Sequence, residues 1–192
     1  QGRQSLDEPT FVDLEPRAAG TSGDGYIWKY LYTIKPNQII KFDSIDFMPV
    51  PNAWGTGETI DIKNNAVDGK IETAVILNAG DGYQPIGTTF NNIPILGDGT
   101  GGKVSVTVNS QGKVSDVTVT NGGTGYTSGT VQFYPGAPGT EIGGPIAGLS
   151  AVGVAGTSVA DIEVVIPPPG GHGFDVYKEL GAFRVLMYAR FE

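Results

Sequence analysis

One stretch of this sequence occurs twice, and the repeat limits what the chain can fold into. Residues 69–83 match residues 112–126 at an offset of 43, and both copies end in Gly-x-Gly-Tyr. Glycines at fixed positions before an aromatic residue are typical of tight turns, because glycine readily adopts positive φ angles. We interpret each copy as a strand, a tight turn and a second strand, closed by a glycine pair whose aromatic residue folds back as an apolar lid.

Two weaker echoes extend this pattern. Residues 159–174 align with the second copy, with three extra residues after the prolines at 167–169, and residues 23–26 repeat the closing motif alone. A single hairpin cannot bury one of its own faces, so repeated hairpins should stack or share a sheet. We therefore expect a repeat-built β module over residues 55–170. Its units are expected near 60–90, 103–134 and 150–174.

Short runs of alternating apolar and polar residues predict strands. Valine alternates with serine or threonine over residues 104–108 and again over 117–120. This period of two gives each strand one buried face and one wet face, which favours an antiparallel sheet. Residues 109–112 between them predict a hairpin loop. Residues 60–63 alternate in the same way and predict another strand, whereas helical periodicity is nearly absent and only 176–180 form a weak helix candidate.

Two longer strand candidates lie on either side of the repeats. Residues 26–34 alternate so that four aromatic residues share one face. These scaffold-strand residues are Tyr26, Trp28, Tyr30 and Tyr32. Residues 183–191 form the second candidate, and we expect the two strands to lie close together in a discontinuous β scaffold made of residues 1–54 and 171–192. The sequence thus predicts an all-β fold, an antiparallel sandwich or barrel-like domain with an inserted module of glycine-rich β-hairpin repeats.

Charge and composition argue against several classes of function. The net charge of −8 disfavours a general nucleic-acid binder, which needs basic residues to neutralise phosphates. The sequence has no cysteine, which excludes disulfides, thiolate metal sites and thiol nucleophiles, and its single histidine excludes a multi-histidine metal site within one chain. No apolar run is long enough for a membrane helix. We expect neither nucleic acid nor a membrane among the partners.

The motifs that could carry chemistry are better explained as turns. Residues 97–102 resemble a phosphate loop but lack the following Lys-Ser/Thr and a strand–helix–strand context. Asp24, Asp81 and Asp98 lie in glycine turns and offer oxygens for calcium, but their spacing fits no known calcium motif and Asp-Gly is ordinary turn chemistry. His172 has no catalytic partner at a recognisable spacing. We predict no catalytic residues, no metal site, no cofactor and no enzymatic activity.

Aromatic residues in loops are the candidates for a protein interface. Trp54 follows the proline-rich residues 49–53 and precedes Gly55, which places it in a loop. The ends of the repeats supply the other candidates, namely Tyr83, Tyr126, His172 and Phe174. Aromatic side chains carry much of the binding energy of protein interfaces, and they also form platforms for sugars. Trp28 is a further aromatic candidate for such a surface, and packing in the protein core is the competing explanation for it.

Part of the chain resembles a family of virion proteins. Residues 23–34, Gly-Asp-Gly-Tyr-Ile-Trp-Lys-Tyr-Leu-Tyr-Thr-Ile, are similar to a recurrent segment of the baseplate wedge protein eight family of T-even-like contractile-tailed phages. Pro36 and the run to Trp54 resemble its continuation, and residues 170–192 resemble its C-terminal strand region more loosely. The glycine–tyrosine repeats resemble decorations of cyanophage-like virion proteins. Under this resemblance the chain would correspond to a C-terminal fragment without the family's N-terminal half, and the repeats would be an insertion.

This resemblance implies an architectural role. The chain would be a β-rich wedge component, assembled in the host cytoplasm, that forms a homodimer and joins other baseplate wedge subunits in the virion tail through large interfaces. The first alternative is a host-recognition or carbohydrate-binding β module of a virion fibre or capsid, with or without calcium; the second is a tail-associated glycan hydrolase. Buried repeat tyrosines and an apolar patch around residues 26–54 would favour the wedge role, whereas exposed repeat aromatics would favour recognition.

Overall fold

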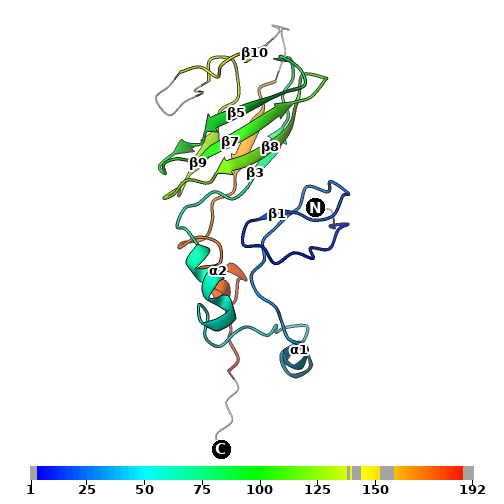
Figure 1. Cartoon of the computed structure of the whole chain (residues 1–192), viewed down its shortest axis with the longest axis vertical. Helices are drawn as coiled ribbons and strands as arrows, with labels where there is room; N and C mark the ends of the chain where they lie inside the picture. The colour runs from blue at the N-terminus through cyan, green and yellow to red at the C-terminus, as the bar shows by residue number, and fades with distance from the viewer. Residues whose placement is uncertain (1–3, 138, 140–143, 152–157, 188–192) are drawn as a thin grey trace, which may run out of the picture. The chain divides into compact units, whose positions relative to one another are not determined.

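The computed structural model describes residues 4–137, 139, 144–151 and 158–187. Most of its regular structure is antiparallel β-sheet with a few short helices, which confirms the all-β prediction (Figure 1). The chain divides into a discontinuous unit, residues 1–67 and 170–192, and a β-sandwich unit, residues 68–169. The boundary predicted at residue 55 therefore differs from the boundary at residue 68, because the intervening helical residues pack with the discontinuous unit.

Two antiparallel sheets face each other in the β-sandwich unit. In one sheet the order is β5-β7-β8, made of Thr88–Pro94, Lys103–Val108 and Val114–Asn121. In the other the order is β3-β11-β9-β6, made of Ala74–Asn78, Asp161–Val164, Gly129–Val131 and Leu96–Gly97. A short pair joins β4 (Tyr83–Gln84) to β10 (Ser150–Ala151). Figure 1 shows β5, β7 and β8 lying side by side.

The alternating valines form the strands that their pattern predicts. Val104, Val106 and Val108 of β7 are completely buried, while the serine and threonine between them lie on the other face. Strands β7 and β8 pair in an antiparallel ladder, which confirms the predicted hairpin. Asn109 holds the connection, because its side-chain oxygen accepts hydrogen bonds from the backbone N–H groups of Gln111 and Lys113.

Phe133 lies at the centre of the core between the two sheets. It is fully buried, and its ring centroid lies 5.0 Å from that of Tyr83 and 5.6 Å from that of Phe90. The surrounding residues are the inward-facing side chains of both sheets, among them Ile93, Val106 and Ile162. Burial of these side chains is the main source of stability in this unit.

The first two copies of the repeat exchange matching backbone hydrogen bonds. The pairs are Ile71 N to Gly122 O and Val114 N to Ala79 O, then Tyr126 N to Gly69 O and Tyr83 N to Gly112 O, with lengths of 2.9–3.2 Å. Strand β3 of the first copy belongs to one sheet and strand β8 of the second copy to the other. Each copy therefore relies on the other for pairing, and the predicted stack of separate hairpin units is not confirmed.

The tyrosines that end these two copies are buried and hydrogen-bonded in the same way. Both are 2% exposed. The Tyr83 hydroxyl donates to Phe133 O at 2.8 Å and accepts from Ala160 N at 2.7 Å. The Tyr126 hydroxyl donates to Ile95 O at 3.0 Å and accepts from Gly102 N at 3.1 Å. Each ring thus packs in the core while its hydroxyl joins two backbone segments next to the strands.

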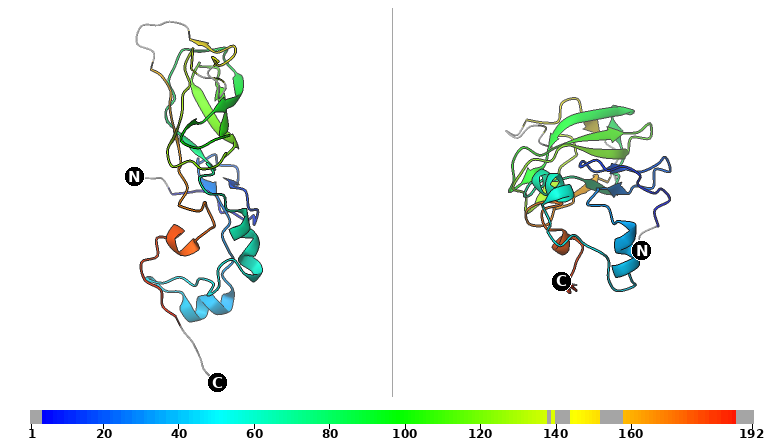
Figure 2. Two further views of the ribbon diagram at one scale, coloured as in Figure 1. Left: turned by 90° about the vertical axis from the view of Figure 1, so that its left-hand side faces the viewer. Right: turned by 60° about the horizontal axis from the view of Figure 1, so that its bottom comes forward.

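The discontinuous unit contains little regular structure. Its elements are β1 (Arg17–Ala18), β2 (Ile27–Trp28), α1 (Pro36–Phe42), the 3₁₀ helix η1 (Gly57–Thr59), α2 (Ile60–Asn65) and α3 (Val176–Glu179). Figure 2 shows these short helices joined by long segments without helix or strand. Helix α3 confirms the weak helix candidate at residues 176–180. No helix among the described residues has the length and apolar character that crossing a membrane requires.

Three strand predictions in this unit are wrong. The scaffold strand expected over residues 26–34 shrinks to two residues, because only Arg17–Ala18 pairs with Ile27–Trp28. Its four aromatic residues, Tyr26, Trp28, Tyr30 and Tyr32, are all half-buried. Residues 183–187 form no strand, and residues 188–191 of that prediction lie outside the described residues. Residues 60–63 belong to helix α2, since an alternation of four residues cannot separate a period of 2 from a period of 3.6.

Candidate protein interface

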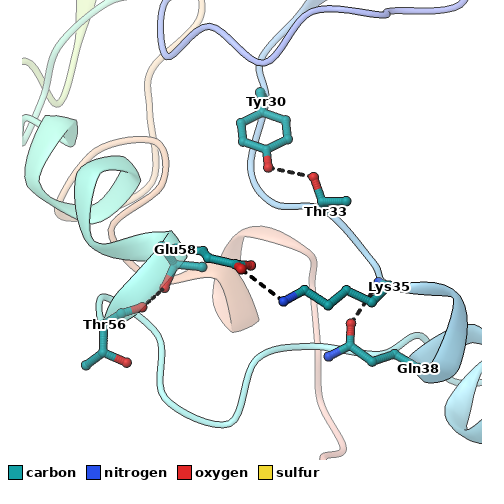
Figure 3. A network of polar contacts seen from close by, with 7 residues as sticks. Tyr30, Thr33, Lys35, Gln38, Thr56 and Glu58 are labelled. Atoms are coloured by element: carbon teal, nitrogen blue, oxygen red, sulfur yellow. Dashed lines mark hydrogen bonds and ion pairs between the residues drawn. The ribbon is translucent and has the colours of Figure 1, made fainter.

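Helix α1 begins in a set of polar contacts at the surface. Pro36 occupies its first position, where the fixed φ of proline suits a helix. The Lys35 N–H donates to the Gln38 side-chain oxygen at 2.8 Å, and the Lys35 ammonium pairs with the Glu58 carboxylate at 2.9 Å. Figure 3 shows these contacts beside the hydrogen bond between the Tyr30 and Thr33 hydroxyls. These interactions are exposed, so each contributes little to stability.

The apolar side chains of α1 and of the turn after it are exposed. No residue of α1 is buried, and Ile40 is 85% exposed. Ser44 shapes the turn, because its hydroxyl accepts hydrogen bonds from Asp46 N and Phe47 N. We call this stretch the 39–48 apolar segment. Its exposed members are Ile39, Ile40, Phe42, Ile45, Phe47 and Met48. A helix of seven residues is too short to be stable alone, so this segment depends on packing against other parts of the chain or against a partner.

The described part of the discontinuous unit has few buried apolar side chains. Four apolar side chains of its described part are buried, namely Ala19, Pro49, Ile62 and Val176. Its large exposed apolar residues outside the 39–48 apolar segment include Leu6, Val12, Phe183, Val185, Leu186 and Met187. Large exposed apolar patches mark sites of protein association, and the 39–48 apolar segment is where exposed apolar residues of this unit lie closest together in the sequence.

Trp54, the first predicted interface residue, is half-buried and held by its own unit. Its indole N–H donates to Gly173 O at 2.9 Å. Its ring meets Tyr32 edge to face, with centroids 6.1 Å apart and an angle of 80°. The Tyr32 hydroxyl in turn donates to Pro49 O at 2.9 Å. Trp54 therefore joins the loop around it to the glycine turn at residues 170–173.

The other predicted interface residues divide into buried and exposed ones. Tyr83 and Tyr126 lie in the core of the β-sandwich unit, where a partner cannot reach their rings, so the structure removes both from the candidate surface. Phe174 is 45% exposed, and the Lys63 ammonium lies 5.3 Å from its ring centroid. Phe174 is thus the predicted candidate that remains available to a partner.

His172 forms a local hydrogen-bonded cluster with Glu179. Its Nδ1 lies 2.7 Å from Glu179 Oε1, while Gly173 N donates to Glu179 Oε2 at 2.7 Å. Burial raises the pKa of Glu179, but the hydrogen bonds from His172 and Gly173 and the charges of His172 and Lys29 outweigh it, so the net pKa is lowered. The ionised carboxylate therefore fastens the glycine turn to α3, a structural role for the only histidine in the sequence.

We expect Glu179→Gln to reduce stability by about 1–3 kcal/mol at pH 7, because a charged hydrogen-bond acceptor is lost. A carboxylate whose pKa is lowered by folding stabilises the folded state above its unfolded pKa of about 4.3, and this contribution disappears as the pH falls through the folded value. Denaturant unfolding at pH 7, 5 and 3, followed by tryptophan fluorescence, should therefore show a difference in unfolding free energy between wild type and Glu179→Gln that becomes smaller in acid. Glu8→Gln, at an exposed position of the same unit, is the control and should change little; a difference for Glu179→Gln that persists unchanged at pH 3 would contradict the assignment.

Two of the three aspartates of the glycine turns, Asp24 and Asp98, are engaged by their own chain, whereas Asp81 Oδ1 is buried and finds no hydrogen-bond partner among the described residues. Asp98 accepts hydrogen bonds from the Thr127 hydroxyl and from the backbone N–H groups of Ser128 and Thr127, which hold its pKa well below the ordinary range. Asp24 accepts from the Ser5 hydroxyl and from the backbone of Leu6 and Tyr26 in the same manner. Within the described ranges no three His, Cys, Asp or Glu residues gather closely enough to hold a metal ion.

Sequence reasoning missed the 39–48 apolar segment as a site. The available signal was the high number of large apolar residues between 39 and 48. These residues follow the strand predicted at 26–34 and lack the glycine-and-aromatic pattern that marked the other candidates. Comparison with known proteins adds no assignment: no family model matches the chain, and no curated protein or solved structure is significantly similar to it.

Proposed function

We propose that this chain is a structural subunit of a phage tail baseplate wedge, which acts by binding other subunits through its discontinuous unit. One observation carries the proposal. The described part of that unit buries four small or medium-sized apolar side chains, whereas the 39–48 apolar segment alone exposes six large ones. Covering such a surface with a partner recovers the hydrophobic free energy that the isolated chain leaves unused, at about 25 cal/mol per Å².

The same part of the chain supports the wedge role on two grounds. The 39–48 apolar segment lies within residues 10–54, which resemble the wedge family. An apolar surface in this region, together with buried repeat tyrosines, is the combination expected of an assembly protein. The proposed partners are a second copy of the chain and other wedge subunits, in the tail baseplate of a virion assembled in the host cytoplasm.

The recognition-module alternative is less well supported. A sugar or receptor platform on the repeats needs exposed aromatic rings, and Tyr83 and Tyr126 are each 2% exposed. Among the aspartates proposed for calcium, Asp24 and Asp98 already accept several hydrogen bonds from their own chain. An assembly role needs none of these groups, because it depends on apolar surface instead.

Light scattering on the full chain tests the proposal. We expect the wild type to form dimers or larger assemblies as its concentration rises. The double variant Ile40→Asp, Ile45→Asp should associate more weakly, with a dissociation constant at least about tenfold higher, because burying two charges opposes association. Both side chains are exposed, so the folded chain should tolerate the changes.

Leu77→Asp is the matched control, since Leu77 is an exposed apolar residue of strand β3 in the other unit. It should assemble as the wild type does. A wild type that stays monomeric at all concentrations, or a double variant that assembles normally, would contradict the proposal. Loss of structure after calcium chelation would instead favour the recognition module.

A further inference from the structure

A groove lined by apolar residues together with the polar Thr88, Thr89 and Asn91 runs beside strand β5 in the β-sandwich unit. It has a volume of about 330 Å³, and none of its described lining residues is charged. Its apolar lining comes from two segments, with Pro85, Phe90 and Ile93 in and before β5, and Pro145, Ile146 and Ala147 in the segment opposite. The groove is therefore suited to apolar side chains rather than to a charged ligand.

Strand β5 is an edge strand of its sheet. Among the described strands its sole neighbour is β7, in the order β5-β7-β8. An edge strand presents backbone N–H and C=O groups that can pair with a further strand. An edge strand beside a groove is the arrangement that binds extended peptides by strand addition, with the backbone providing affinity and the groove accepting alternate side chains.

The C-terminal segment has the pattern of a strand but no sheet. Phe183, Val185 and Met187 alternate with Arg184 and Leu186, so an extended conformation gives one face that is wholly apolar. These three side chains are 67–89% exposed. No described strand includes residues 183–187, which follow the end of helix α3.

We propose that residues 183–187 of one copy add as a strand to the β5 edge of a second copy. Phe183, Val185 and Met187 then face the groove, while Arg184 lies on the opposite face. Charge favours this pairing, because residues 68–169 contain three lysines and eight acidic residues, a net charge of −5, and Arg184 is the charged residue of the segment. The inference rests on the proposed assembly function and specifies one contact by which copies join.

Engineered cysteines test this contact, since the chain has none of its own. Full-length Val185→Cys is mixed with full-length Ala147→Cys and oxidised mildly, and mixed disulfides are measured by mass spectrometry. Both positions are exposed, so folding should be preserved. The control is a mixture of Val185→Cys with Ser110→Cys, an exposed position in the β7–β8 turn. Docking raises the effective concentration of the two thiols, so the yield of mixed disulfide with Ala147→Cys should be at least about fivefold higher than with this control.

Equal yields with Ala147→Cys and Ser110→Cys would overturn the proposal. An internal disulfide in a monomeric Ala147→Cys, Val185→Cys double variant would also overturn it, because the segment would then occupy the groove of its own copy. If the mixed disulfide is absent while light scattering still detects assemblies, strand addition fails and the proposed function stands. If the chain is monomeric throughout, both fail.

Discussion

Replacing Phe133 with alanine should destabilise the β-sandwich unit by about 3–5 kcal/mol. Phe133 is fully buried between the two sheets, in contact with the rings of Tyr83 and Phe90. Its removal leaves a cavity whose walls belong to hydrogen-bonded ladders on both sides, so the neighbouring strands cannot easily move in to fill it. The loss also weakens the packing around Tyr83, whose hydroxyl bonds to the Phe133 backbone.

The measurement must report on the correct unit. Both tryptophans, Trp28 and Trp54, lie in the discontinuous unit, so their fluorescence does not follow the sandwich. Hydrogen exchange of the β7 amides, at one fixed protein concentration, follows it directly. Tyr134→Ala is the control, because the neighbouring ring is 38% exposed and should cost much less. Similar losses for both variants would show that Phe133 is not the centre of the core.

Replacing Gly123 with alanine should destabilise the same unit by about 3 kcal/mol. The residue has φ of +61°, a conformation that alanine adopts with strain. An added Cβ would lie 2.3 Å from Thr100 O and 2.6 Å from Gly102 N. Both obstacles are backbone atoms, so relief requires the loop to shift, and the adjacent Tyr126 hydroxyl is bonded to that same loop.

Gly125→Ala provides the matched control two residues away. Gly125 has φ of +74°, but its added Cβ would meet nothing within 4 Å. Only the conformational strain remains, about 1–2 kcal/mol. The two variants should therefore differ by about 1–2 kcal/mol in denaturant unfolding followed by far-UV circular dichroism. Equal stability of the two would mean that the close backbone contact at Gly123 does not constrain this loop.

For the candidate interface, most of the residues that the sequence suggested as contacts are covered by their own chain. An apolar patch around residues 26–54 is the feature that would favour the wedge role, and the exposed 39–48 apolar segment lies within that range. However, the aromatic residues selected as contacts, Trp54 and the repeat tyrosines, are held inside their own units. Aromatic side chains suit interfaces and cores equally well, so residue type alone could not tell which of them would be covered by the same chain.

The sequence by itself determined the features that depend on neighbouring residues. Alternating valines specified strands β7 and β8 with their buried faces, and residues 109–112 specified the hairpin between them. These predictions succeeded because a period of two and a turn motif are local properties, and because the partner strand follows at once in the chain. The all-β class follows from many such segments together.

Only the tertiary structure decided which surfaces are paired and which are left open. It placed β3 beside β11, more than eighty residues away, and used the Tyr83 and Tyr126 hydroxyls to join distant backbone segments. It also left residues 29–34 and 183–187 without a sheet, although both have the alternation of strands. The physical reason is that alternation within a segment defines only its apolar face and its edge. Which strand covers that face or pairs with that edge depends on residues far away in the sequence or on residues of another molecule.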